Sequence, residues 1–256
     1  MTELAFALWA EAPSLRDADV ARLVARLIPA VQAGQIQLAN LTNAYIAGLA
    51  AAEGVQIASA RVDRDAILGY RGVPAAEVYR RPVTTVYTKL AAGQPFEVAK
   101  KAGLARLGSI LSSDLQQSRT RQARAALSRS GYSGFRRVLT GKEDCALCVI
   151  ASTQRYHRGD LMPIHPGCDC GVEPFTQPRN DQVIDQALLD QTHAVIDQKL
   201  GGTDYQARDL GLGKTSSKGQ PLSDFTDLIV TREHGELGPT LTWRTDQFTS
   251  AADLGL

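Results

Sequence analysis

Two short runs, Cys145-Ala146-Leu147-Cys148 and His165-Pro166-Gly167-Cys168-Asp169-Cys170, decide what kind of chain this is. Together they hold all 4 cysteines of the 256 residues. Zinc is commonly held by four Cys or His side chains that converge as a tetrahedron from two such clips. The gap between the two runs lies in the range typical of paired-clip sites. The sequence therefore predicts a small zinc-bearing module here.

Five side chains compete for the four positions around such a metal: Cys145, Cys148, His165, Cys168 and Cys170. The spacing favours the first four, with Cys170 as the substitute. A site filled by four protein ligands leaves no place for a reacting water, so the metal is expected to be structural. The alternatives are two disulfides, which a cytosolic setting disfavours, buried thiols without metal, or a C-x2-C redox pair, which no surrounding βαβ pattern supports.

The residues before this module have the pattern of long helices. Between 13 and 53, apolar residues recur at spacings of three and four, which indicates one stripe facing a core. The stripe consists of Val20, Val24, Leu27, Val31, Leu38, Leu41 and Tyr45. Pro13-Ser14 is expected to begin this helix, with Ser14 and Asp17 as a capping box. Pro29 is expected to kink or split it.

A loop is expected over 69–74, followed by a helix over 75–92 that Pro82 interrupts. The longest continuous helix is expected over 94–130. Its apolar stripe consists of Leu104, Leu107, Leu111 and Leu115. Its distal part is nearly all polar, Ala and Arg, and glycines end it.

Charge is divided unevenly along the chain. The net charge is only +1, but residues 1–140 carry +8 and residues 141–256 carry −7. Four arginines, Arg119, Arg121, Arg124 and Arg129, spread around the predicted long helix instead of sharing one face. They indicate either a solvated electropositive helix or a surface that contacts DNA phosphates or an acidic protein.

The predicted fold class is α+β, mainly α, with long N-terminal helices, a small zinc-bearing module and an extended C-terminal arm. A short strand is expected at 135–139, a helix at 181–200, a linker or arm from 201, and β-like runs at 228–231 and 240–243. The expected domains are a helical region 1–134, the Cys/His module 135–178, a helix 179–200, and a linker with the arm 201–256.

No apolar run approaches the ~18 residues that a membrane span needs. The apolar patch near the N-terminus has no basic residue before it and is flanked by Glu3 and Glu11, so it does not resemble a secretory signal. No membrane association and folding in the cytosol are expected.

The run 140–148, Thr-Gly-Lys-Glu-Asp-Cys-Ala-Leu-Cys, followed by His-Pro-Gly-Cys-Asp-Cys at 165–170, resembles the phage Mu F-like minor head proteins. Their pattern is C-x2-C, a loop with an aromatic residue and a glycine, H-P-x-C-x-C and a short strand. Residues 156–159, Tyr-His-Arg-Gly, correspond to that loop and residues 172–174 to that strand. The tail over 232–239 resembles versions from phages of actinobacteria.

The resemblance implies a minor capsid protein of tailed-phage head morphogenesis. Such proteins are packaged in the procapsid, associate with the portal protein and the inner capsid, and are linked to DNA packaging or ejection. The implied partners are the portal protein and the major capsid or scaffolding protein. The charge pattern adds packaged double-stranded DNA, contacted through the phosphates by the four arginines, as a further expected partner. The implied location is inside the virion head near the portal, and the host cytoplasm during assembly.

Versions from actinobacterial phages are often labelled capsid maturation proteases, so a protease is the first alternative. Ser152, His157 and Asp160 lie close in sequence and are the candidates for a triad, but triads are defined by geometry. The chain has no G-x-S-x-G elbow and no H-E-x-x-H motif. The sequence therefore favours a structural role over a protease, with a non-specific DNA-binding virion protein as the second alternative.

Overall fold

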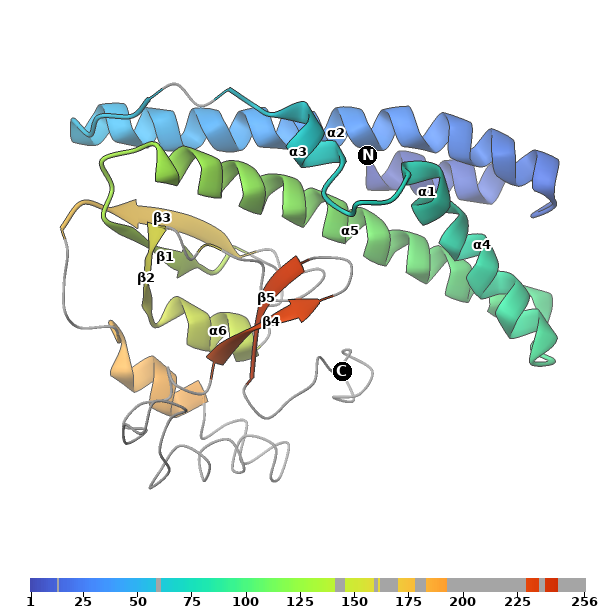
Figure 1. Cartoon of the computed structure of the whole chain (residues 1–256). Helices are drawn as coiled ribbons and strands as arrows, with labels where there is room; N and C mark the ends of the chain where they lie inside the picture. Colours follow the sequence, from blue (N-terminus) through green and yellow to red (C-terminus); the bar gives the residue numbers. More distant parts are fainter. Residues whose placement is uncertain are drawn as a thin grey trace. The chain divides into compact units, whose positions relative to one another are not determined.

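Long helices occupy the first half of the chain and a small antiparallel sheet follows them in the computed structural model (Figure 1). The structure describes residues 1–12, 14–58, 61–140, 146–158, 161, 170–177, 183–192, 229–234 and 238–243. The chain forms two compact units, Met1–Leu49 with Ser59–Ala126, and Ala50–Ala58 with Leu127–Leu256. The predicted class, α+β and mainly α, is confirmed at this coarse level.

Five helices build the N-terminal half: α1 Thr2–Glu11, α2 Asp17–Glu53, α3 Arg64–Leu68, α4 Ala75–Ala91 and α5 Phe96–Ser128. Local chemistry explains several of their ends. The Asp63 carboxylate accepts a hydrogen bond of 3.0 Å from the Ala66 amide and so caps α3. Gly54 and Gly93 follow α2 and α4 with φ of 68° and 80°, a left-handed conformation that glycine adopts without steric cost.

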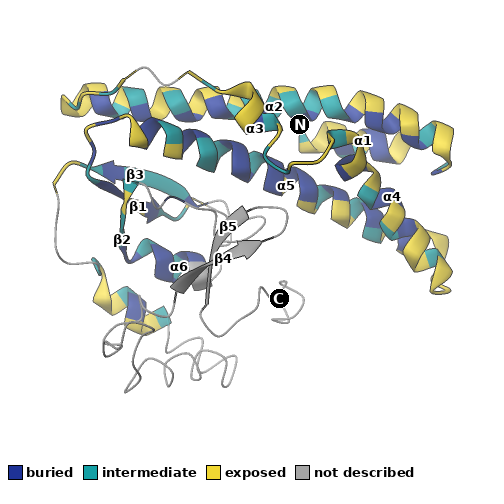
Figure 2. Ribbon diagram, viewed as in Figure 1, coloured by how far each residue is buried: buried dark blue, intermediate teal, exposed yellow. Residues whose placement is uncertain are grey.

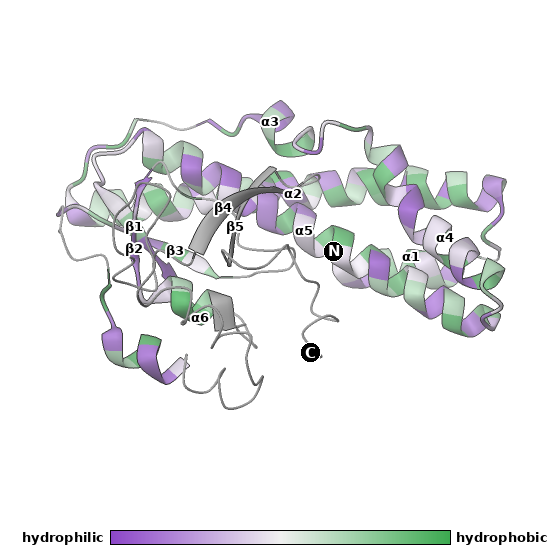
Figure 3. Cartoon of the chain, turned by 60° about the horizontal axis from the view of Figure 1, so that its bottom comes forward, coloured by the Kyte–Doolittle hydropathy of each residue, from purple (hydrophilic) through white to green (hydrophobic). Residues whose placement is uncertain are grey.

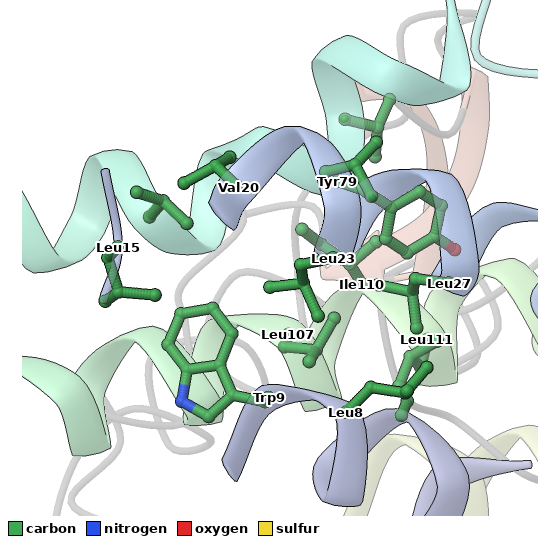
Figure 4. Packing of buried hydrophobic residues seen from close by; sticks show 14 of the residues in the cluster. Leu8, Trp9, Leu15, Val20, Leu23, Leu27, Tyr79, Leu107, Ile110 and Leu111 are labelled. Carbon is green, nitrogen blue, oxygen red and sulfur yellow. The ribbon is translucent and has the colours of Figure 1, made fainter. Parts of the chain in front are cut away.

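One apolar core holds α1, α2, α4 and α5 together within the first unit. Figure 4 shows Trp9 of α1, Leu23 and Leu27 of α2, and Leu107 and Leu111 of α5 packed against one another. The buried faces of these helices are visible as dark blue bands in Figure 2. Helix α1 was not expected from the sequence, because a ten-residue apolar segment has too few turns to show a clear period.

Gly103 lets these helices approach one another closely. A Cβ atom built on this residue of α5 would lie 2.5 Å from Val86 Cγ2, 2.8 Å from Trp9 Cζ2 and 2.9 Å from the Pro82 carbonyl oxygen. Such distances are well inside van der Waals contact, so any larger residue would push α1 and α4 away from α5.

Neither proline ends its helix, so the expected split at Pro29 and the expected interruption at Pro82 are wrong, while a kink at Pro29 stays a prediction. Helix α2 continues through Pro29 and α4 continues through Pro82. Pro29 lies on the exposed face, where water can satisfy the carbonyl that loses its partner, while Leu27 and Val31 anchor both sides in the core. As a result α2, with 37 residues, is longer than α5, with 33, contrary to the prediction for 94–130.

Two further expectations for α2 need correction. Ser14 does not form a capping box with Asp17; its hydroxyl donates to the Asp19 carboxylate, and with Arg22 it holds the pKa of Asp19 below its usual value. The predicted core-facing stripe holds for Val20, Val24, Leu27 and Val31, which are buried. Leu41 and Tyr45 are exposed instead.

Most of the polar residues in the second half of α5 before Arg119 are buried, although the sequence of this half resembles a solvated helix. Figure 3 shows hydrophilic and hydrophobic residues mixed along the long helices. The buried polar residues of α5 are Ser113, Asp114, Gln116, Gln117, Ser118 and Gln122. Asp114 accepts hydrogen bonds from Tyr70 Oη at 2.6 Å, Arg71 Nε at 2.9 Å and Tyr79 Oη. These bonds fix the predicted loop over 69–74 to the helix core.

The second unit contains a three-stranded antiparallel sheet in the order β2-β1-β3. Its strands are β1 Gly134–Val138, β2 Arg155–His157 and β3 Gly171–Phe175, and α6, Ala146–Ser152, lies between β1 and β2 in the chain. The predicted strand at 135–139 is confirmed with a shift of one residue, and the strand expected at 172–174 is part of β3. Tyr156 and His157 lie in β2, not in a loop.

A β-hairpin and one further helical segment complete the described residues. Strands β4 Ile229–His234 and β5 Gly238–Trp243 pair antiparallel, which confirms the two β-like runs expected near the C-terminus. Residues 186–192 are helical and form part of the helix predicted over 181–200. The rest of that helix, the linker from 201 and the turn between the hairpin strands lie outside the described residues.

Candidate metal centre

The central strand β1 organises the candidate site. Phe135 and Arg137 are both buried and share one face of this strand, since side chains alternate along a strand. The Phe135 ring stacks on Tyr156 of β2, with ring centroids 5.3 Å apart. Gly134 makes the close pairing possible, because a Cβ there would lie 2.3 Å from the Tyr156 carbonyl oxygen.

Two of the five predicted metal ligands, Cys148 and Cys170, are among the described residues of this module. Cys148, on α6, is 2% exposed, and Cys170, immediately before β3, is 5% exposed. Both are free cysteines and take no part in a disulfide. Arg137 Nη1 donates to Cys170 Sγ at 3.3 Å, and the same guanidinium lies 5.6 Å from the centre of the Tyr156 ring.

The pKa of the Tyr156 phenol depends on burial, on Arg137 and on both cysteines. Burial raises the pKa of the Tyr156 phenol to about 12, the Arg137 guanidinium opposes this rise, and negative charge on Cys170 and Cys148 adds to it. The Tyr156 hydroxyl donates to the Ala151 carbonyl at 3.0 Å, which ties β2 to the end of α6. Arg137 links Cys170 to this ring, because its guanidinium contacts both the Cys170 sulfur and the Tyr156 ring.

The other three candidates, Cys145, His165 and Cys168, lie outside the described residues. Among the residues that are described, no group of three His, Cys, Asp or Glu side chains is placed to hold a metal. The choice of four ligands from five stays a prediction. The surroundings of the two described cysteines suit a metal thiolate: both are buried, and Arg137 donates an N–H group to the Cys170 sulfur, as hydrogen-bond donors around metal thiolates do.

The structure describes two of the three protease candidates, Ser152 and His157. The Ser152 hydroxyl donates to the Val149 carbonyl of its own helix at 2.6 Å. His157 is exposed on β2, and Asp160 lies outside the described residues. A nucleophilic serine needs its hydroxyl hydrogen-bonded to a base, and the bond seen for Ser152 is a helix-terminus bond instead.

The four arginines proposed to contact DNA have different environments. Arg119 and Arg121 are half-buried, and Arg121 stacks on the Tyr70 ring at 5.3 Å. Burial lowers the pKa of Arg121, and the nearby Tyr70 opposes this. Arg124 and Arg129 are exposed. Two of the four therefore take part in packing within the chain.

The opposite face of the sheet carries a pocket of about 640 Å³. Arg136 points to this face and pairs with Glu173 of β3 at 2.8 Å, while Arg155 of β2 lies opposite Arg136 in the register. Ser152, Phe175 and Asp185 also line the pocket. Its charged groups are of both signs, so it has no clear preference for an anion or a cation.

Sequence reasoning missed Arg137, the residue that contacts the Cys170 sulfur. A signal was present, because Phe135-Arg136-Arg137 within a short strand places one arginine on the same face as a buried aromatic residue. A charged side chain that is buried at such a position needs a buried hydrogen-bond or ion-pair partner.

No protein-family model, curated protein or solved structure matches the chain. Within the described ranges, no helix combines the length and the apolar character that a membrane crossing requires.

Proposed function

We propose that this chain is a tailed-phage minor head protein of the Mu F-like kind, packaged in the procapsid and associated with the portal and the inner capsid. It would support head morphogenesis and DNA packaging or ejection. The observation that carries the proposal is the order of motif and fold. The C-x2-C run enters α6 between β1 and β2, and the second run leads directly into β3 beside β1. Both halves of the motif therefore lie next to strands of the same small sheet in the chain.

A structural metal belongs to this proposal. Cys145, Cys148, His165 and Cys168 would hold zinc, with Cys170 as the substitute ligand. Bound zinc would cross-link the two ends of the module and supply folding energy. Arg137 would then orient the Cys170 sulfur, and the burial of Cys148 and Cys170 would keep water away from both sulfurs.

A structural role is proposed in preference to a protease because of Ser152. Its hydroxyl is hydrogen-bonded within α6, and the sequence has no other marked nucleophile. Non-specific DNA binding remains a secondary role that Arg124 and Arg129 could serve from the surface.

The test is mass spectrometry of purified particles of the phage that encodes the chain, with chemical cross-linking. We expect the chain in the particles, cross-linked to the portal protein. A variant with both Cys148→Ser and Cys170→Ser, which leaves only three of the five candidate ligands, should be lost from particles. Ser152→Ala and His157→Ala are the matched controls and should leave both incorporation and the mass of the major capsid protein unchanged.

Two results would overturn the proposal. One is that the chain is absent from particles that assemble in its presence. The other is that the major capsid protein is trimmed with the wild-type chain and untrimmed with Ser152→Ala or His157→Ala, which would establish the protease.

A further inference from the structure

The second half of α2, residues 33–49, turns an apolar stripe toward solvent. Leu41 is 60% exposed and Tyr45 is 51% exposed, while the face buried over the same stretch consists of Gln35, Ala39, Thr42 and Ile46. This stripe continues the buried one: from Val31 through Leu38 and Leu41 to Tyr45 it covers 14 residues, which is two heptads with an average spacing of 3.5 residues. Because a straight α-helix has 3.6 residues per turn, a stripe with a repeat of 3.5 gradually rotates around it. The stripe that faces the core at Val31 therefore faces solvent at Tyr45.

This face carries no charge. No charged residue lies between Arg26 and Glu53, and the exposed positions of this stretch are Ala33, Gln37, Asn40, Leu41, Ala44, Tyr45 and Gly48. Exposed helix faces normally carry charged residues, whereas the centres of protein interfaces are depleted of charge and enriched in aromatic residues. A neutral face also lacks the Lys and Arg that nucleic acids or anionic membranes attract.

Gly48 is a second, independent sign of an external neighbour. It lies inside α2, where glycine destabilises a helix relative to alanine. A Cβ built on it meets no atom of the described chain within 4 Å, in contrast to Gly103, where three helices meet. No packing within the described residues therefore explains this glycine. With Ala44 one turn before it, Gly48 lets another helix approach closely.

The properties of this face fit a second copy of the same chain. A two-fold interface uses one patch on both partners, so the patch must be compatible with itself, and an uncharged face meets that condition. The three-four spacing is that of helix pairs with interlocking side chains. Seventeen helical residues extend for about 25 Å, which gives a small interface of the kind found in weak complexes.

We propose that two copies of this chain associate through α2, with Leu38, Leu41, Tyr45 and Gly48 of one copy against the same face of the other. This inference goes beyond the proposed function and does not depend on it.

The experiment is sedimentation velocity of the full chain between about 1 and 200 µM, a range that brackets a weak dimer. Three variants are compared: Leu41→Lys with Tyr45→Lys, Leu41→Glu with Tyr45→Glu, and the control Val98→Lys. Val98 is 49% exposed on α5, so the control adds a charge at a site of similar exposure. We expect a reversible dimer for the wild type and the control. Like charges should weaken association roughly a hundredfold in each double variant.

An equimolar mixture of the two double variants should restore association, because lysines would then face glutamates. Helix content by circular dichroism should be the same in all variants, since the substituted side chains are exposed. A wild type that stays monomeric over the whole range overturns the inference. So does a dimer that persists in both double variants, or a mixture of the two that stays monomeric.

Discussion

Asp114 is the single acid in the basic stretch between Lys100 and Arg137, and it is the acceptor for a buried group of donors. The side chains of Asp114 and Arg71 are almost completely buried, and Arg71 Nη2 lies 2.8 Å from Asp114 Oδ1. The hydroxyl groups of Tyr70 and Tyr79 also donate to this carboxylate. A buried ion pair is tolerated only when further hydrogen bonds satisfy both charges. The two tyrosine hydroxyls are therefore needed to stabilise the buried ion pair.

Tyr79 should make the free energy of unfolding of the chain fall as the pH rises into the alkaline range. Burial, followed by the negative charge of Asp114, raises the pKa of Tyr79 well above its ordinary value of 10. The folded state then keeps the proton, while the unfolded state loses it above about pH 10. The contribution is fully present below pH 10, and the free energy of unfolding should fall above it by up to about 1.4 kcal/mol per pH unit.

The measurement is urea unfolding between pH 7 and 11 for the wild type and Tyr79→Phe. The variant should lose about 1–3 kcal/mol at pH 7, because Asp114 loses a buried donor, and should show the shallower decline above pH 10. Tyr87→Phe, on the same helix with a half-exposed ring, is the control for removal of a hydroxyl. Equal slopes for the wild type and Tyr79→Phe would contradict the argument.

The helices show where sequence periodicity is a good guide and where it fails. The spacing of Val20, Val24, Leu27 and Val31 predicted a buried face correctly, because core packing and helical period agree there. At Leu41 and Tyr45 the same spacing of apolar residues continues, but these side chains are no longer in the core. Which face of α2 is covered there depends on the three-dimensional course of α5, which the sequence period does not contain. Pro29 illustrates a similar limit, since tertiary contacts on both sides keep the helix continuous.

Gly103→Ala should destabilise the first unit although alanine favours helices. Helical propensity alone would add about 0.5–1 kcal/mol. The added methyl group would meet the Pro82 carbonyl and two side chains within 3 Å, and overpacking of this kind costs about 1–3 kcal/mol. We expect a lower midpoint in urea. Gly108→Ala on the same helix is the control, because its nearest atom is the movable end of Phe6 at 3.3 Å. Equal stability of the two variants would show that α4 moves freely from α5.

At the scale of the molecule, the sequence indicated a helical region followed by a small cysteine-bearing module. The cysteine spacing and the strand at 135–139 were recognisable because turn residues and alternation are local signals. Strand β2 was not recognisable, since three residues between a helix and a loop have no period. Arg137 beside Cys170 depends on the pairing of β1 with β3, which joins residues more than 30 positions apart.

Metal removal tests whether the second unit depends on its cysteines. If zinc holds the module, a strong chelator or Cys145→Ser with Cys168→Ser should unfold it, because metal binding of ~10 kcal/mol or more is coupled to folding. Hydrogen exchange should then become fast at β1 and β3 and stay slow at Leu107 and Leu111 of α5, whose core lies in the first unit. Cys170→Ser alone should keep the metal if Cys170 is the fifth, substitute ligand. Unchanged melting and unchanged metal content in the double variant would refute the zinc module, because two thiolates cannot be lost from a four-ligand site without effect.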